Sequence, residues 1–133
     1  MRLTVLLAGM IPALTAPAMA EDTALTAVIS AQIDAFLADD MVTAFGYASP
    51  MIRDMFGSAE NFGRMVRQGY PMVYRPTEVQ FLGVKDLGSV LRQRVLIRDS
   101  GGATHLLDYD MIRVGTDWRI NGVHLIEAPG IGV

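Results

Sequence analysis

The sequence predicts an α+β domain in which N-terminal helices pack on a curved antiparallel β-sheet. Two observations carry this prediction. Between about residues 23 and 70, apolar side chains recur at helical spacing, and each run follows a residue type that caps helices. From about residue 78 onward, apolar and polar residues alternate, and glycine-containing turns separate the alternating runs. Helices followed by consecutive strands are typical of the α+β class.

The first twenty residues have the features of a secretory signal peptide. Arg2 provides a positive charge, a short apolar run follows, and Ala18-Met19-Ala20 provides small residues at a cleavage site. The apolar run is shorter than the roughly 20 residues that a membrane-spanning helix needs. We therefore expect cleavage after Ala20, no stable membrane insertion afterwards, and a single periplasmic or secreted domain over residues 21–133. The alternative is a retained N-terminal anchor.

The composition excludes several classes of function. The chain carries a net charge of −3 and lacks the basic stripe expected of a nucleic-acid-binding protein. It contains no cysteine, which excludes a lipoprotein attachment site, disulfides and a catalytic thiol. The serine-hydrolase motif G-x-S-x-G and a phosphate-binding loop are also missing from the sequence. No cofactor is expected.

The first helix of the domain is predicted from about residue 23 to residue 37. One stripe of it follows the 3.6-residue period and should face the core: Leu25, Ile29, Gln32 and Phe36. Gln32 is the polar member of this stripe, and a buried amide without partners costs about 1–3 kcal/mol. It is therefore either a core residue with internal hydrogen bonds or a contact to a ligand.

Three short helices are predicted next, each preceded by a capping residue. Asp39-Asp40 could be a pair of catalytic acids, but we interpret them as caps, because a carboxylate accepts hydrogen bonds from the free N–H groups at a helix start. Ser49-Pro50 combines a serine cap with a proline at the first helical position, where its missing N–H is harmless. Ser58 should cap a last helix that ends near residue 68.

The rest of the chain is predicted to be extended. Two prolines bracket Met72–Arg75, which should form an edge-like or looping stretch. Three alternating runs then predict strands at Glu78–Val84, Leu91–Arg98 and Ala103–Val114.

The loop Ser100–Gly102 fixes how the second and third of these strands pair. It places Arg94 opposite Asp108 on the outer face and Gln93 opposite Tyr109 on the inner face. A slip by one residue would put apolar side chains opposite charges, so this register is strongly specified. The inner face then carries Leu91, Gln93, Val95 and Ile97 opposite Met111, Tyr109, Leu107 and His105.

A two-residue turn at Gly115-Thr116 predicts a further hairpin and a last strand. Continuing its register without interruption places Tyr109 over Gly122 and Leu107 opposite His124. His124 is therefore expected on the inner face of the sheet.

Several motifs together resemble a known family. They are Ile29-x-x-Gln32-x-x-Ala35-Phe36, Asp40-x-x-x-Ala44-Phe45, Ala48-Ser49-Pro50, Phe56-Gly57, Tyr70-Pro71 and Trp118-Arg119-Ile120-Asn121-Gly122-Val123. With these motifs the chain resembles small exported bacterial proteins of the domain of unknown function 4864, and more broadly the nuclear transport factor 2-like, or cystatin-like, superfold. The resemblance implies a cone-shaped sheet around a long helix. It implies no activity, because that superfold includes isomerase- and dehydratase-type enzymes as well as non-catalytic binding and dimerisation domains.

The predicted inner surface provides a candidate ligand pocket. Its polar members are Gln32, Gln93, His105, Tyr109 and His124. No carboxylate lies on this face to orient a histidine base, so no catalytic residue is assigned. Two histidines without an inward acid are too few for a metal site.

Two classes of function follow from this pocket. The favoured one is a non-catalytic module that binds a small apolar ligand or a protein, including a homodimer formed through the sheet. The alternative is a small-molecule isomerase or dehydratase that uses Tyr109 and a histidine. An open cavity that reaches Gln32, Gln93 and Tyr109 would favour a ligand or substrate, and a closed apolar interior would favour a purely structural core. The side chains expected to close such a core are Phe36, Phe45, Phe62, Met65 and Trp118.

Overall fold

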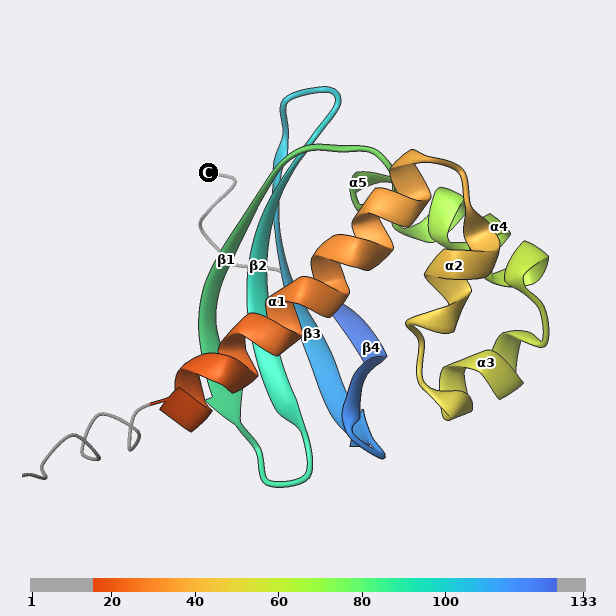
Figure 1. Cartoon of the computed structure of the whole chain (residues 1–133). Coiled ribbons are helices and arrows are strands. Elements are labelled where there is room, and N and C mark those ends of the chain that lie inside the picture. The colour runs from red at the N-terminus through yellow and green to blue at the C-terminus, as the bar shows by residue number, and fades with distance from the viewer. Residues whose placement is uncertain (1–15, 127–133) are drawn as a thin grey trace, which may run out of the picture.

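The computed structural model describes residues 16–126, with side chains from residue 22 onward, and within this range helices precede a four-stranded sheet (Figure 1). The helices are α1 (Ala16–Leu37), α2 (Met41–Gly46), α3 (Pro50–Phe56), α4 (Ala59–Gly69) and α5 (Pro71–Tyr74). The strands are β1 (Pro76–Asp86), β2 (Leu91–Asp99), β3 (Thr104–Val114) and β4 (Asp117–Ile126). The predicted α+β class is confirmed.

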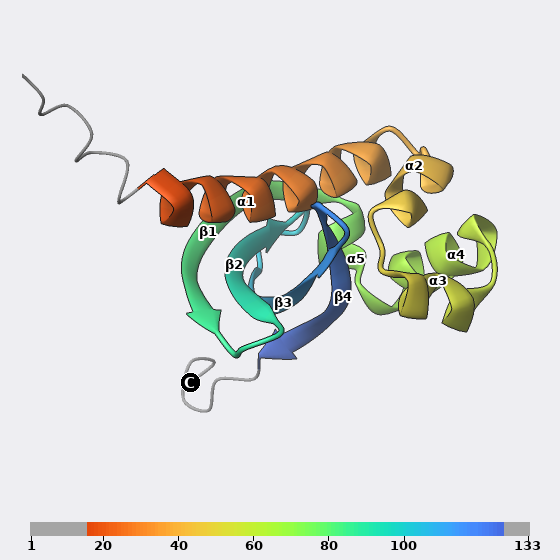
Figure 2. The same cartoon turned by 60° about the horizontal axis from the view of Figure 1, so that its bottom comes forward.

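The long helix α1 lies across one face of the sheet, which curves beneath it (Figures 1 and 2). All members of its predicted stripe are buried, from Leu25 at 0% exposed to Gln32 at 3%. The helix ends at Leu37 as predicted but begins earlier, at Ala16. The predicted signal peptide lies mostly outside the described residues. None of the described helices is long and apolar enough to cross a membrane.

The short helices gather beside the edge strand β4 (Figure 2), and their predicted caps are confirmed. The side chain of Asp40 accepts from the backbone N–H of Thr43 at 3.1 Å and caps α2. Ser49 and Ser58 cap α3 and α4 in the same way. These caps satisfy backbone donors that have no partner within their own helix, so they fix where each short helix begins.

The prediction of an extended stretch at Met72–Arg75 is wrong, because Pro71–Tyr74 forms the helical turn α5. Pro71 occupies the first turn, where its missing N–H is harmless. The N–H groups of Tyr74 and Arg75 bond back to the carbonyls of Tyr70 and Pro71. This turn buries Met72 and Val73, and the burial outweighs the extended preference that we inferred from the two prolines.

The sheet is antiparallel with the strand order β1-β2-β3-β4. Every pair between β2 and β3 matches the predicted register, including Gln93 with Tyr109. On the face away from α1, Arg94 Nε lies 2.9 Å from Asp108 Oδ1. No described helix covers this outer face in either view (Figures 1 and 2). The homodimer expected through the sheet stays a prediction, since the structure contains one chain.

The register of β3 with β4 follows the prediction only as far as Met111 and Ile120. Beyond this pair a β-bulge shifts the strands by one residue, so Gly122 pairs with Asp110. The predicted pairings of Tyr109 with Gly122 and of Leu107 with His124 are therefore wrong. Because one extra residue reverses the face of everything after it, His124 lies opposite Asp108, on the outer face.

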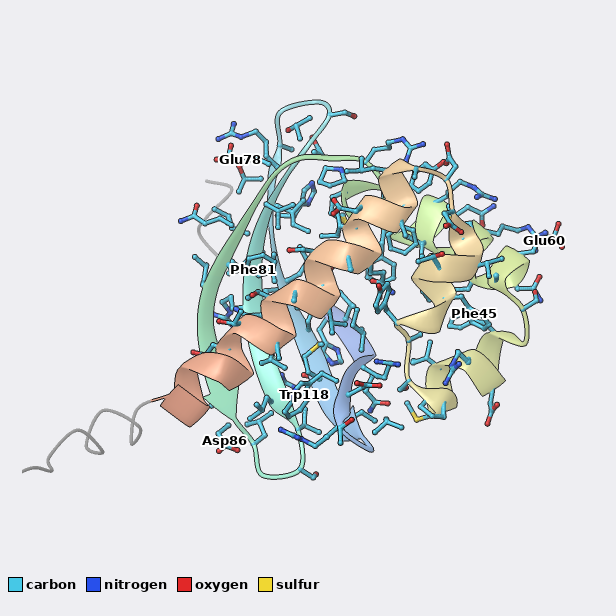
Figure 3. All side chains as sticks on the ribbon, viewed as in Figure 1. Phe45, Glu60, Glu78, Phe81, Asp86 and Trp118 are labelled. Atoms are coloured by element: carbon cyan, nitrogen blue, oxygen red, sulfur yellow. The ribbon has the colours of Figure 1, made fainter. Side chains whose placement is uncertain are left out.

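The core fills the space between α1 and the sheet and continues among the short helices. At its helical end, the ring of Phe62 lies 6.0 Å from that of Phe36 and 5.3 Å from that of Phe45. Figure 3 shows Phe45 within the group of short helices and Trp118 at the start of β4, near the β3–β4 turn. Trp118 is covered there by the guanidinium of Arg113, 4.8 Å from its ring. These aromatic residues therefore close different parts of the core.

Candidate functional site

A cleft of about 260 Å³ opens between α1, the short helices and the edge strand β4. Its walls are almost entirely apolar. The wall residues are Phe36, Ala48, Ile52, Met55, Phe56, Phe62, Met65, Val66, Val73, Ile120 and Val123, together with Gln32, Tyr70, Gly122 and His124. A concave, mostly apolar site with few polar groups is the usual form of a small-molecule pocket.

The helix α3 forms one wall of the cleft and is the least buried element around it. It contributes Ile52, Met55 and Phe56, and none of its residues is buried. Met55 remains 64% exposed. Segments with few buried contacts open most easily, so α3 is the wall best able to adapt to a ligand.

The chain just before α3 is fixed firmly to β4. Ser49 is fully buried, and its N–H donates to the carbonyl of Ile120 at 2.8 Å. Its hydroxyl donates to Oδ1 of Asn121 at 2.7 Å and accepts from the N–H of Ile52 at 3.3 Å. Asn121 is the bulged residue of β4, so this contact joins the bulge to the helices.

Among the described residues of the cleft wall, Gln32 is the one buried polar side chain. Its Nε2 donates to the carbonyl of Ala44 at 3.1 Å. No described residue donates a hydrogen bond to its Oε1. The two predicted roles, core residue and ligand contact, therefore do not exclude each other, because Gln32 makes an internal hydrogen bond and also lines the cleft.

Gln93 and His105 lie away from the cleft. Gln93 is 1% exposed, and its Nε2 donates to the carbonyls of Leu82 and Arg94 at 3.0 and 2.9 Å, where the pairing of β1 with β2 is irregular. His105 lies 2.8 Å from Asp99 at the β2–β3 turn. Neither side chain is part of the cleft wall.

Tyr109 lies on the inner face, as the register predicts, but behind the cleft rather than in its wall. Its cross-strand neighbour Val123 does line the cleft, and the Tyr70 hydroxyl donates to the carbonyl of Val123 at 3.1 Å. The Tyr109 hydroxyl is sealed from solvent and has no hydrogen-bond partner among the described residues. Burial, and then the nearby Tyr70, raise the pKa of Tyr109, so this phenol stays neutral.

Tyr109→Phe is expected to raise the free energy of unfolding by about 1 kcal/mol, because a buried hydroxyl without a partner is unfavourable. Chemical denaturation of the wild type and the variant measures this change. A loss of stability would contradict the assignment, since it would mean that the hydroxyl makes a bond in the folded protein.

His124 lies at the rim of the cleft and is 54% exposed. Its Nε2 is 2.8 Å from Oδ2 of Asp110, and Arg92 bonds both oxygens of the same carboxylate. Arg92 first, and then His124, hold the pKa of Asp110 below its usual range. Because a carboxylate only accepts, Nε2 carries the proton of a neutral His124 ring, which leaves Nδ1 as a proton acceptor.

The adjacent acids Asp39 and Asp40 have structural partners outside the cleft. Asp40 caps α2, and its bonds from Thr43 lower its pKa. Asp39 accepts from the Tyr74 hydroxyl and forms an ion pair with Arg75 at 2.9 Å. The bond from Tyr74, followed by that from Arg75, lowers the pKa of Asp39, so neither acid is suited to donate a proton near neutral pH.

Of the five candidate pocket residues, the structure brings Gln32 and His124 to one cleft and places Gln93, His105 and Tyr109 elsewhere. The sequence analysis missed the wall made by α3. The spacing of Ile52, Met55 and Phe56 on one helical face was the signal that could have revealed it. Among the described residues, no group of three or more histidines and acids is placed to hold a metal ion.

Residues 18–133 match the model of a protein family described as a domain of unknown function (DUF4864). No match was found among the curated proteins or among the solved structures. The family match includes every strand and the short helices around the cleft. The likeness to the nuclear transport factor 2-like superfold and its cone shape stay predictions.

Proposed function

The chain belongs to the DUF4864 family, and from the cleft beside β4 we propose that it is a non-catalytic binding protein for a small apolar molecule. One observation carries the proposal: the described walls of the cleft are apolar except for a few polar groups, and the buried one among these is the amide of Gln32. Sites of this kind gain affinity from apolar burial and orientation from a few polar groups.

The size of the cleft points to a compact ligand. An engineered apolar cavity of roughly 150 Å³ holds benzene. By proportion, a cleft of about 260 Å³ accommodates a molecule of roughly ten non-hydrogen atoms. A bicyclic hydrocarbon matches this volume better than a peptide segment or a long acyl chain does.

The polar groups around the cleft favour binding over catalysis. Among the described residues of its wall there is no carboxylate. The hydroxyl of Tyr70 donates to the carbonyl of Val123, and one of the two N–H groups of the Gln32 amide donates to Ala44, so of these two side chains a single amide N–H is left to stabilise an oxyanion. These groups can orient a ligand, but they offer little to a developing negative charge.

Titration with naphthalene, which has ten carbon atoms, tests the proposal. We expect saturable binding of one molecule per chain, followed by a change in naphthalene fluorescence or by calorimetry. Non-saturable partitioning, or no binding up to the solubility limit, would refute the proposed function.

The pair of His124 and Asp110 favours a second candidate function, an isomerase-type enzyme that removes a proton next to a carbonyl group. The bulge supplies the orienting acid that the sequence analysis did not find. Deuterium exchange into 2-tetralone, a bicyclic ketone of matching size, tests this candidate in D₂O by NMR. Exchange faster than in buffer and lost in His124→Gln would support the enzyme, and exchange at the buffer rate would exclude it for this ketone.

We also propose that the domain is exported to the periplasm or secreted, on the strength of Arg2, the short apolar run and Ala18-Met19-Ala20. N-terminal sequencing of the protein from its native host should then begin at Glu21. A chain that begins at Met1 and is recovered with the cytoplasmic fraction would contradict export.

A further inference from the structure

We propose that the ligand of this cleft is a neutral molecule that donates a hydrogen bond to Oε1 of Gln32, with an alcohol or phenol as the simplest case. The inference rests on the proposed binding function and specifies the polar group that the ligand must carry.

The orientation of the Gln32 amide is fixed by chemistry. Its partner inside the protein is the carbonyl oxygen of Ala44, which can only accept, so the NH₂ group must face it. Oε1 then points away from Ala44. A ligand group that contacts Oε1 therefore meets an acceptor.

The acceptor is available to the cleft. Gln32 is 3% exposed and forms part of the wall. Among the described side chains, one buried polar atom both lacks a hydrogen-bond partner and is closed off from solvent, and this atom is the hydroxyl of Tyr109. Oε1 of Gln32 accepts no hydrogen bond from a described residue and is not closed off in this way, and Gln32 lines the cleft, so we infer that Oε1 faces the open volume.

An acceptor in an apolar wall selects among ligands. A ligand O–H or N–H forms the missing bond, whereas an ether oxygen placed against Oε1 brings two acceptors together and leaves Oε1 without a donor. A carboxylate is worse, because it brings a negative charge to a wall whose described residues include no lysine or arginine. The imidazole of His124 stands at the rim and is already paired with Asp110.

Four probes with the same bicyclic frame separate these cases: naphthalene, 2-naphthol, 2-methoxynaphthalene and 2-naphthoate. At neutral pH we expect 2-naphthol to bind about five- to tenfold more tightly than naphthalene, the gain from one net hydrogen bond. 2-Methoxynaphthalene should bind no more tightly than naphthalene, and 2-naphthoate more weakly. Calorimetry on the purified protein gives all four dissociation constants.

Gln32→Met is the matched variant, because methionine keeps the length of the side chain and removes its polar atoms. The Ala44 carbonyl still accepts from the N–H of Tyr47 at 3.2 Å, so α2 keeps a bond at this position. The variant should bind naphthalene within about twofold of the wild type and lose the preference for 2-naphthol. If the variant does not fold, the wild-type comparison of 2-naphthol with its methyl ether decides alone.

The outcomes separate this inference from the proposed function. Equal binding of 2-naphthol and its methyl ether by the wild type overturns the donor requirement and leaves apolar binding intact. If 2-naphthoate binds most tightly of the four probes, the donor requirement is likewise overturned and apolar binding is left intact. A preference for 2-naphthol that persists in Gln32→Met overturns the role of Gln32. Failure of all four probes to bind refutes the proposed function itself.

Discussion

Ser49→Ala is expected to lower the free energy of unfolding by about 2–3 kcal/mol, more than the roughly 1 kcal/mol typical of a helix cap. The sequence alone predicts the cap and its ordinary cost. The structure adds that Ser49 is fully buried and donates to Oδ1 of Asn121 at 2.7 Å. Alanine removes the cap and also leaves this oxygen in the bulge without its donor.

Ser58→Ala is the matched control, because Ser58 caps α4 through Asn61 at the surface and has no second partner among the described side chains. Its loss should stay near 1 kcal/mol. Urea unfolding of both variants gives the comparison. Equal losses would mean that the bond from Ser49 to the bulge adds nothing to stability.

Met65→Trp is expected to weaken naphthalene binding by about tenfold or more, because the larger ring occupies the apolar volume that a ligand needs. Met65 lines the cleft from α4 and is only partly buried, so the indole can enter the hollow without displacing the core. The affinity is measured by the same titration as for the wild type.

Met51→Trp is the control variant, because it makes the same substitution outside the wall of the cleft. Met51 lies on α3 next to the cleft, but it is 51% exposed and is not part of the wall. This variant should bind naphthalene as the wild type does. Unchanged binding in both variants would place the ligand elsewhere on the protein.

The elements and the central register could be predicted because local chemistry specifies them. Serine and aspartate caps mark the helix starts, and Ser49 and Ser58 are found where this rule places them. In β2 and β3, a single register pairs opposite charges on one face and apolar side chains on the other, as Arg94 and Asp108 show.

The bulge in β4 could not be predicted from the strand pattern. It is stabilised by a bond between Ser49 and Asn121, which lie 72 residues apart in the sequence. Alternation of side chains carries no information about such a contact, so an uninterrupted register predicts the wrong face for His124. The consequence reaches the site, because His124 then meets Asp110 at the rim of the cleft.

The cleft itself depends on how the short helices sit against β4. Periodicity indicates that Phe62 and Met65 face inward. It does not show whether other side chains fill the space that these two side chains face. In the structure Phe62 is buried against other rings and also lines the cleft, and Met65 and the apolar side of α3 border the same cleft. Tertiary packing, rather than any local motif, therefore decides between a closed core and a binding site.

A nuclear Overhauser measurement on isotope-labelled protein saturated with naphthalene tests the central claim most directly. If the cleft is the binding site, cross-peaks from naphthalene should reach the methyl groups of Met65, Val66 and Val123. Cross-peaks to Leu96 and Leu106, which pair on the outer face of the sheet, would instead show that the ligand binds there and would contradict the account.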